Sequence, residues 1–335
     1  MGILFKRGGM YTTIQDMGRY GYQSLGFSTS GVMDKKAYTL ANMLLDNDLG
    51  EAVIEFTMVG PSIQIQTDTF VAITGGSFSP RLNGDIVQEN TAIQVHKGDC
   101  LEFGQAVKGS FGYIAFAGGI DIPKEMNSYS TNTKSLIGGF HGRKLKNGDY
   151  IRLKESVTYL TDFLSRKISD KYLDYYNNNM VRVIPGPQDN CFTKKGIDTF
   201  YSSDYVLTAQ CDRMGYRLEG SYIEHKNGSA DIISDGICEG AVQVPAHGQP
   251  IIMLADRQTT GGYTKIATVI SSDIPVLVQK RQNDVIKFKA IGIQEAQEIY
   301  MAQLKEYEDI KKQIHKPCRE VLQPRAAAQR IRTLF

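Results

Sequence analysis

The stretch Lys97-Gly98-Asp99-Cys100-Leu101-Glu102-Phe103 joins a tight turn to a short alternating strand. The same pattern returns as Asn147-Gly148-Asp149-Tyr150-Ile151-Arg152-Leu153 and as Gln282-Asn283-Asp284-Val285-Ile286-Lys287-Phe288. In each copy a Gly or Asn before the Asp supplies the positive φ that a tight turn needs. The recurrence predicts a related β unit in each half of the chain.

Short alternating segments dominate the rest of the sequence. Residues 62–66 (SIQIQ) alternate strictly, as a half-buried strand should, and residues 70–74 and 93–95 follow the same logic. Many short strands separated by turn signals favour a barrel or a sandwich over alternating strands and helices. The sequence therefore predicts a mainly β fold with a few short helices.

Two segments have helical periodicity. Residues 35–45 carry a regular apolar stripe, and Asp34 is well placed as the N-cap. A longer stripe runs over residues 293–314 and ends before Pro317. A polar, Tyr- and Asn-rich stretch separates the two halves. We predict domains at 1–155 and 180–291, a linker at 156–179, and a C-terminal helix with a basic tail at 292–335.

Composition gives no reason to expect nucleic acid or an anionic membrane as a partner. The 335 residues carry a net charge of +2, and no apolar run approaches the roughly 18 residues of a membrane span. The apolar run at residues 1–5 is too short for a signal-peptide core. The five cysteines are scattered without a C-x-x-C pair, as expected for free thiols in a reducing compartment. We expect a cytoplasmic protein.

Several familiar catalytic motifs are absent from the sequence. It has no G-x-x-x-x-G-K-[S/T] phosphate loop and no G-x-S-x-G nucleophile elbow. The five histidines form no H-E-x-x-H or H-x-H cluster, so we predict no metal site. There is no Met-Lys-Met sequence for attaching biotin, and we expect no biotin on this chain.

Charged and amide residues gather in three blocks of otherwise glycine-rich or apolar sequence. They are residues 12–19 with 31–34, residues 211–218, and residues 256–263, which follow an apolar strand. Adjacent Asp-Arg pairs occur at 212–213 and 256–257, and such pairs can grip a planar polar group from both ends. From the residues alone, a structural ion pair bracing a loop is an equally good interpretation.

The same blocks carry a resemblance to a known family. The strings TTIQDMGRYGYQSLGFSTSGVMD, ANMLLDN, IEFTMVGP, IPGPQ, DRMGYRL, EGAVQVPAHGQP and LADRQTTGGYTKIATVI occur in order between residues 12 and 270. Together they resemble the allophanate hydrolase subunit 2 family, which includes the C subunit of 5-oxoprolinase, an antagonist of a kinase inhibitor, and the carboxyltransferase domain of urea carboxylase. The resemblance implies two tandem cyclophilin-like β-barrels.

The resemblance also implies a role on an N–C=O group within a heteromeric enzyme. The favoured role is a subunit of ATP-dependent 5-oxoprolinase. Its partners would be a subunit 1-type protein, similar to the B subunit of 5-oxoprolinase, and a third subunit, with ATP used by the assembled complex. The alternatives are a regulatory protein that antagonises a histidine-kinase inhibitor, and a carboxyltransferase or allophanate hydrolase subunit in urea breakdown.

Ligand sites favour domain junctions, so the polar blocks of both halves are expected to converge on one pocket. Within it, we predict that Arg257 holds a carboxylate or carbonyl oxygen and that Asp256 accepts an N–H. The predicted catalytic residues are Asp256, Arg257, Asp212 and Arg213, and the predicted substrate-binding residues are Gln243, Gln258, Thr259, Thr260, Tyr263, Arg217, Arg19 and Asp34.

Overall fold

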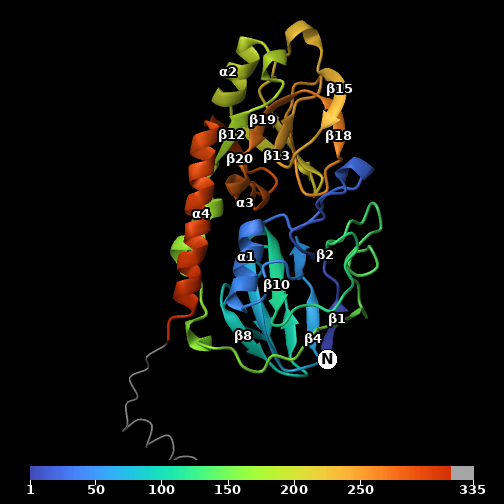
Figure 1. Cartoon of the computed structure of the whole chain (residues 1–335), viewed down its shortest axis with the longest axis vertical. Helices are drawn as coiled ribbons and strands as arrows, with labels where there is room; N and C mark the ends of the chain where they lie inside the picture. Colours follow the sequence, from blue (N-terminus) through green and yellow to red (C-terminus); the bar gives the residue numbers. More distant parts are fainter. Residues whose placement is uncertain (318–335) are drawn as a thin grey trace, which may run out of the picture.

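A computed structural model describes residues 1–317, and the predicted basic tail at 318–335 lies outside the described residues. The two β-rich halves lie one above the other along the long axis of the molecule, and one long helix runs alongside both (Figure 1). The prediction of a mainly β fold with a barrel and a C-terminal helix is confirmed. The predicted domain boundaries stay a prediction.

The first half consists of two sheets packed around one core. The six-stranded sheet has the order β11-β1-β4-β9-β6-β7, and the five-stranded sheet has the order β2-β3-β10-β5-β8. Apolar side chains from both sheets, such as Phe5, Ile63, Phe56 and Ile114, are buried between them. The strands are β1 (Gly2–Arg7), β2 (Tyr11–Gln15), β3 (Val53–Thr57), β4 (Ser62–Ile65), β5 (Thr69–Ser77), β6 (Arg81–Leu82), β7 (Asp85–Ile86), β8 (Ala92–Val95), β9 (Cys100–Glu102), β10 (Lys108–Phe116) and β11 (Tyr150–Arg152).

In the second half, seven strands close into a barrel with the order β12-β19-β16-β17-β14-β13-β20. A separate two-stranded ribbon, β15 with β18, lies on its outside (Figure 1). Among the described residues, a closed ring of strands is found only in this half. The strands are β12 (Met180–Pro185), β13 (Tyr205–Cys211), β14 (Gly215–Gly220), β15 (Asp231–Gly236), β16 (Ala241–Gln243), β17 (Ile251–Met253), β18 (Thr260–Tyr263), β19 (Lys265–Val269) and β20 (Val285–Ala290).

The recurrent turn has the conformation that its sequence predicts. Each copy precedes a strand, and its Gly or Asn has a φ between 71° and 101°. The following Asp carboxylate accepts a hydrogen bond from the backbone N–H three residues earlier, which fixes the turn. These acceptors are Asp99 from His96 at 2.7 Å, Asp149 from Lys146 at 2.9 Å, and Asp284 from Arg281 at 2.7 Å.

The predicted helices are also confirmed. Helix α1 (Lys35–Leu44) begins at Asp34, whose carboxylate accepts the Ala37 N–H at 2.9 Å. Helix α4 (Ile293–Ile314) has the predicted bounds, although Ile293 at its start is 55% exposed and only Ile310 and Ile314 are buried. Helices α2 (Lys194–Ser202) and α3 (Ile274–Val278) belong to the second half.

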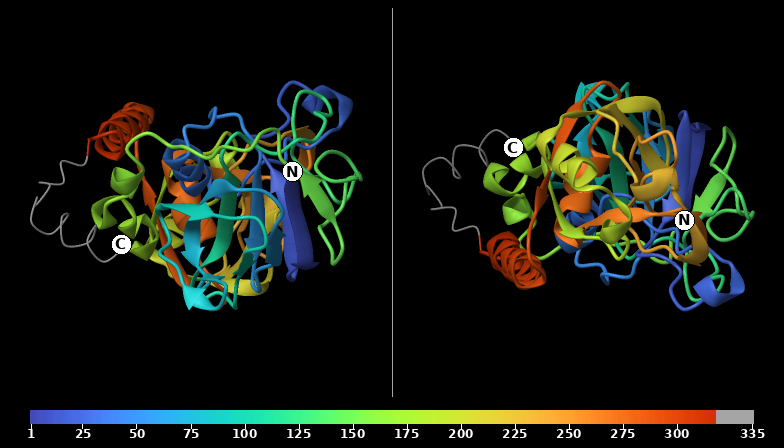
Figure 2. Two further views of the ribbon diagram at one scale, coloured as in Figure 1. Left: turned by 90° about the horizontal axis from the view of Figure 1, so that it is seen from below. Right: turned by 90° about the horizontal axis from the view of Figure 1, so that it is seen from above.

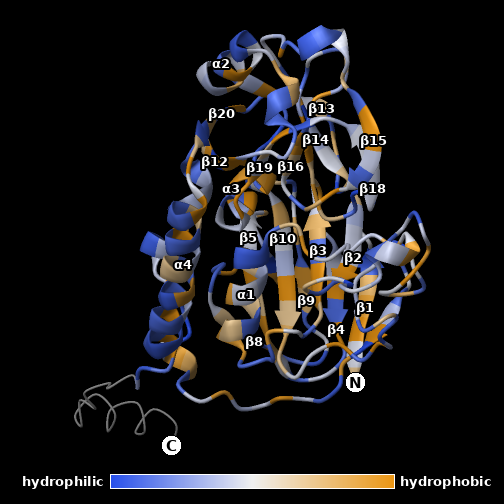
Figure 3. Ribbon diagram, turned by 45° about the horizontal axis from the view of Figure 1, so that its top comes forward, coloured by the Kyte–Doolittle hydropathy of each residue, from blue (hydrophilic) through white to orange (hydrophobic). Residues whose placement is uncertain are grey.

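The two halves share an apolar cluster that is distinct from the core between the two sheets of the first half. The buried faces of α1, α3 and the C-terminal end of α4 belong to a single cluster with the barrel interior. Hydropathy colouring shows apolar strands inside both halves and a largely polar α4 (Figure 3). Burial of this shared surface is the main force that holds the halves together.

Helix α4 also contacts both halves through polar side chains. Ser272 of the second half donates to Gln303 at 2.8 Å, and Lys36 of α1 pairs with Glu306 at 2.6 Å. End-on views show α4 on one side of the molecule and the loops around residues 120–145 on the other (Figure 2). Within residues 1–317, no helix combines the length and apolar character that a membrane crossing requires.

Candidate active site at the junction of the two halves

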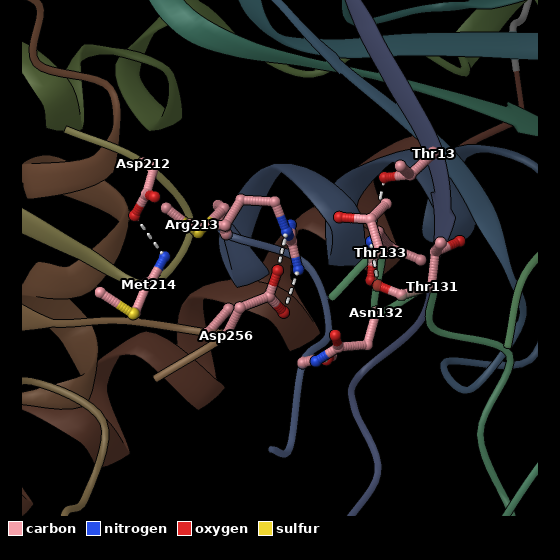
Figure 4. Close-up of polar contacts among 12 residues, drawn as sticks. Thr13, Thr131, Asn132, Thr133, Asp212, Arg213, Met214 and Asp256 are labelled. Atoms are coloured by element: carbon pink, nitrogen blue, oxygen red, sulfur yellow. Dashed lines mark hydrogen bonds and ion pairs between the residues drawn. The ribbon is translucent and has the colours of Figure 1, made fainter. Parts of the chain in front are cut away.

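The hairpin turn between β13 and β14 carries the second half toward the first. The Asp212 carboxylate accepts the backbone N–H groups of Met214 at 2.8 Å and Gly215 at 3.2 Å, which shapes the turn. Asp212 and Met214 lie on one side of the turn, and the Arg213 side chain extends away from them to Asp256 (Figure 4). Asp212 and Arg213, although adjacent in sequence, therefore have different contacts: Asp212 shapes the turn, and Arg213 reaches Asp256.

Arg213 is buried between acceptors from both halves. Its Nε donates to Asp256 Oδ2 at 2.8 Å, and its Nη2 donates to the Gly31 carbonyl at 2.6 Å. Its Nη1 forms an ion pair with Glu55 of β3, and the three charged side chains are each less than a tenth exposed. Burial opposes the charge on Arg213, but Asp256 and Glu55 outweigh it and raise its pKa.

Glu55 connects Arg213 to the interior of the first half. Its Oε2 accepts the Met33 N–H at 2.7 Å and the Tyr113 hydroxyl at 2.9 Å. Burial raises the pKa of the Glu55 carboxyl, and Arg213 and these two hydrogen bonds oppose the rise. Sequence reasoning missed Glu55, although one acid in the apolar strand VIEFT is a signal of a buried partner.

Asp34 lies in a second polar contact between the halves. Besides capping α1, its carboxylate accepts the Tyr175 hydroxyl at 2.5 Å and the Gln279 amide at 2.8 Å. Its backbone N–H donates to the Tyr113 hydroxyl oxygen at 2.8 Å. Burial raises the pKa of the Asp34 carboxyl. Tyr113 therefore joins the Asp34 and Glu55 contacts into one buried network.

Arg257 does not contact a carboxylate. Its Nε donates to the Ile237 carbonyl at 3.0 Å, and its Nη1 donates to the Leu254 carbonyl at 3.2 Å and to Thr29 Oγ1 at 3.1 Å. Its own carbonyl accepts the Ser28 hydroxyl at 2.7 Å. These contacts hold the loop after β17 against the first half.

The side of the junction that the first half contributes is rich in hydroxyl and amide groups. Gln15 of β2 donates to Thr13 Oγ1 at 2.9 Å and to the Thr131 carbonyl at 3.1 Å. Its Oε1 is buried and has no partner among the described residues. Thr13 and residues 131–133 face the Arg213–Asp256 pair across the junction (Figure 4). Arg19 lies in the same half, where it donates to the Glu125 and Ser130 carbonyls.

The remaining predicted residues are spread over the outside of the barrel. Gln243 of β16 is buried, and its amide nitrogen has no partner among residues 1–317. Tyr263 and Thr260 are exposed on the outer ribbon, as is Gln258 before it, and Thr259 there is half-buried. Arg217 of β14 lines an open hollow of about 380 Å³ together with Asp212 and Met214.

The structure thus brings Arg213, Asp256 and Arg257 to the junction with the first half. It places Asp34 in the buried network that Tyr113 links to Glu55, and it places Arg19 in a separate contact within the first half. It places Arg217 and Asp212 on the barrel surface. Within residues 1–317, no three His, Cys, Asp or Glu side chains gather closely enough to hold a metal ion.

Comparison with known proteins gives a consistent result. The profile of the carboxyltransferase domain, subdomain A and B, matches residues 25–290. The chain is 35% identical to the C subunit of 5-oxoprolinase from Escherichia coli over 309 residues, which cover 92% of this chain and 97% of that protein. It is 35% identical to the C subunit of 5-oxoprolinase from Haemophilus influenzae, covering 89% and 96%.

Urea-processing proteins are similar over a small part of their length. Urea amidolyase of Saccharomyces cerevisiae is 29% identical over 90% of this chain and 17% of that protein. The crystal structure of Kluyveromyces lactis urea carboxylase matches with a TM-score of 0.84 and 27% identity, covering 92% of this chain and 29% of that one. The chain therefore belongs to the carboxyltransferase domain family, subdomains A and B, in which the C subunit of 5-oxoprolinase is a relative along nearly its whole length.

Proposed function

We propose that this chain is a subunit of a heteromeric, ATP-dependent 5-oxoprolinase that opens the lactam of 5-oxoproline to glutamate in the cytoplasm. The observation that carries the proposal is the 35% identity to the C subunit of 5-oxoprolinase across 97% of that protein. The similarity to urea amidolyase covers 17% of that protein. Activity on the lactam is expected only with a partner similar to the B subunit of 5-oxoprolinase and with a third subunit.

ATP serves the assembled complex in this proposal. The chain has no phosphate loop of the P-loop type, and the proposal therefore assigns no contact with ATP to its residues. What this chain contributes is the junction, where Arg213, Asp256 and Glu55 fix the relative position of the two halves. A rigid scaffold of this kind is what the positioning of a substrate requires.

Substrate selectivity tests the proposal against its main alternative. The structural likeness to urea carboxylase favours urea breakdown as the second candidate. In the complex reconstituted with its partner subunits, 5-oxoproline is expected to stimulate ATP hydrolysis, and urea and allophanate are not. Stimulation by urea or allophanate alone would assign the chain to urea breakdown. A complex that responds to none of them but releases a histidine kinase from its inhibitor would assign it a regulatory role.

Replacement of Arg257 by Lys separates a brace from a substrate ligand. Lys keeps the charge and loses the planar fork, so at least one of the contacts to Ile237, Leu254 and Thr29 is lost. We expect a loss of about 1–2 kcal/mol in the free energy of unfolding and an unchanged KM for 5-oxoproline. Unfolding in urea and steady-state kinetics of the complex measure the two quantities. A raised KM with unchanged stability would make Arg257 a substrate ligand.

A further inference from the structure

The outer surface of the barrel has a hollow that is lined in part by Arg217. Strand alternation turns Tyr216 and Leu218 into the barrel, where both are buried, and turns Arg217 outward. The hollow of about 380 Å³ adjoins a second one of about 490 Å³, and both are lined by Arg217, Gln210 and Ile251. An irregularity in the pairing of β13 with β14, between Leu207 and Cys211, lies beside it.

Arg217 differs from every other arginine among residues 1–317. Each of the others donates a side-chain hydrogen bond or forms an ion pair within the protein, whereas no such contact is found for the half-buried Arg217. A guanidinium held in a hollow without a partner is a ready site for a carboxylate, which it can bind through two parallel hydrogen bonds.

The rest of the lining fits a small ring that carries an amide. Met214, Ile251 and Met253 supply apolar surface for ring methylenes. The Gln210 amide offers both a donor and an acceptor, which matches the C=O and N–H of a lactam. The Asp212 carboxylate in the same lining accepts the Met214 and Gly215 N–H groups, both through Oδ1.

We propose that the Arg217 hollow binds a small lactam carboxylic acid, with Arg217 on the carboxylate and Gln210 on the lactam amide. This inference rests on the proposed function, since 5-oxoproline is such a compound. The turn that forms one edge of the hollow also carries Arg213, so the junction network holds the hollow's edge in place.

The test is direct binding to the full-length chain without its partners, observed by NMR of the side-chain amides and the arginine Nε–H groups. Saturating 5-oxoproline is expected to shift the Gln210 amide and Arg217 Nε signals. Arg217→Met is expected to weaken 5-oxoproline binding at least about tenfold. Arg217→Met should leave the affinity for 2-pyrrolidinone unchanged, because that compound lacks the carboxylate. Arg217→Lys should retain part of the affinity, because it keeps the charge.

Arg81→Met is the matched control, because exposed Arg81 donates only to the Gly84 carbonyl. An unchanged unfolding midpoint of Arg217→Met shows that the fold is intact. Equal 5-oxoproline affinity in wild-type and Arg217→Met chains, or no shift at Gln210 and Arg217, would overturn the site even if the complex turns over 5-oxoproline. Binding at the hollow without turnover by the complex would retain the site and reject the proposed function.

Discussion

Replacing Arg213 with Met is expected to lower the free energy of unfolding by about 3–5 kcal/mol at pH 7. The substitution keeps much of the side-chain volume but leaves Glu55 and Asp256 in a buried site without their cation. An uncompensated buried charge costs far more than the loss of an exposed pair, which is typically worth less than about 1 kcal/mol. Chemical denaturation of the full-length chain measures the change.

The loss should depend on pH. Burial already raises the pKa of Glu55, and Arg213 is what opposes the rise. Without Arg213 the folded pKa of Glu55 lies further above its unfolded value of about 4.3. An acid with a raised folded pKa contributes stability that is present below its unfolded pKa and is lost as pH rises through the folded pKa. The deficit of Arg213→Met should therefore shrink as the pH is lowered from 7 toward 4.

Two further variants make this prediction specific. Arg81→Met removes an exposed arginine and should change the free energy of unfolding by no more than about 0.5 kcal/mol. Adding Glu55→Gln to Arg213→Met removes one stranded carboxylate and should recover part of the loss. A deficit below about 1 kcal/mol in Arg213→Met, equal at pH 4 and pH 7, would contradict a bracing role for the pair.

Features encoded locally were predictable from the sequence. The Gly-Asp and Asn-Asp turns specify positive φ and an Asp acceptor within a few residues, so their strands were found correctly. Helix α1 was predictable because its cap and its apolar stripe lie in one continuous segment. The C-terminal helix is predictable from its apolar stripe and from the Pro317 that follows it.

Contacts between distant segments were not predictable in this way. The charged partner of Arg213 in the first half is Glu55, which is 158 positions away, and no local pattern joins them. The adjacent pairs 212–213 and 256–257 read as two units, yet the structure pairs Arg213 with Asp256. It directs Asp212 to backbone N–H groups, and Arg257 to backbone carbonyls and the Thr29 hydroxyl. Alternation along a strand or turn sends neighbours to opposite surroundings, so adjacency in sequence misleads at such sites.

Omitting this chain from the reconstituted enzyme is expected to abolish 5-oxoproline-dependent ATP hydrolysis. The proposal makes the chain one of several required subunits, and no recognised nucleotide loop or nucleophile elbow equips it to act alone. The isolated chain should likewise be inactive. Adding it back should restore activity, which saturates at a fixed ratio to its partners.

The most direct measurement follows glutamate and ADP together in mixtures that contain all subunits, all but this chain, or this chain alone. We expect coupled release of both products, dependent on 5-oxoproline, only in the complete mixture. Full activity in the mixture that lacks this chain, or robust turnover by the chain alone, would contradict it.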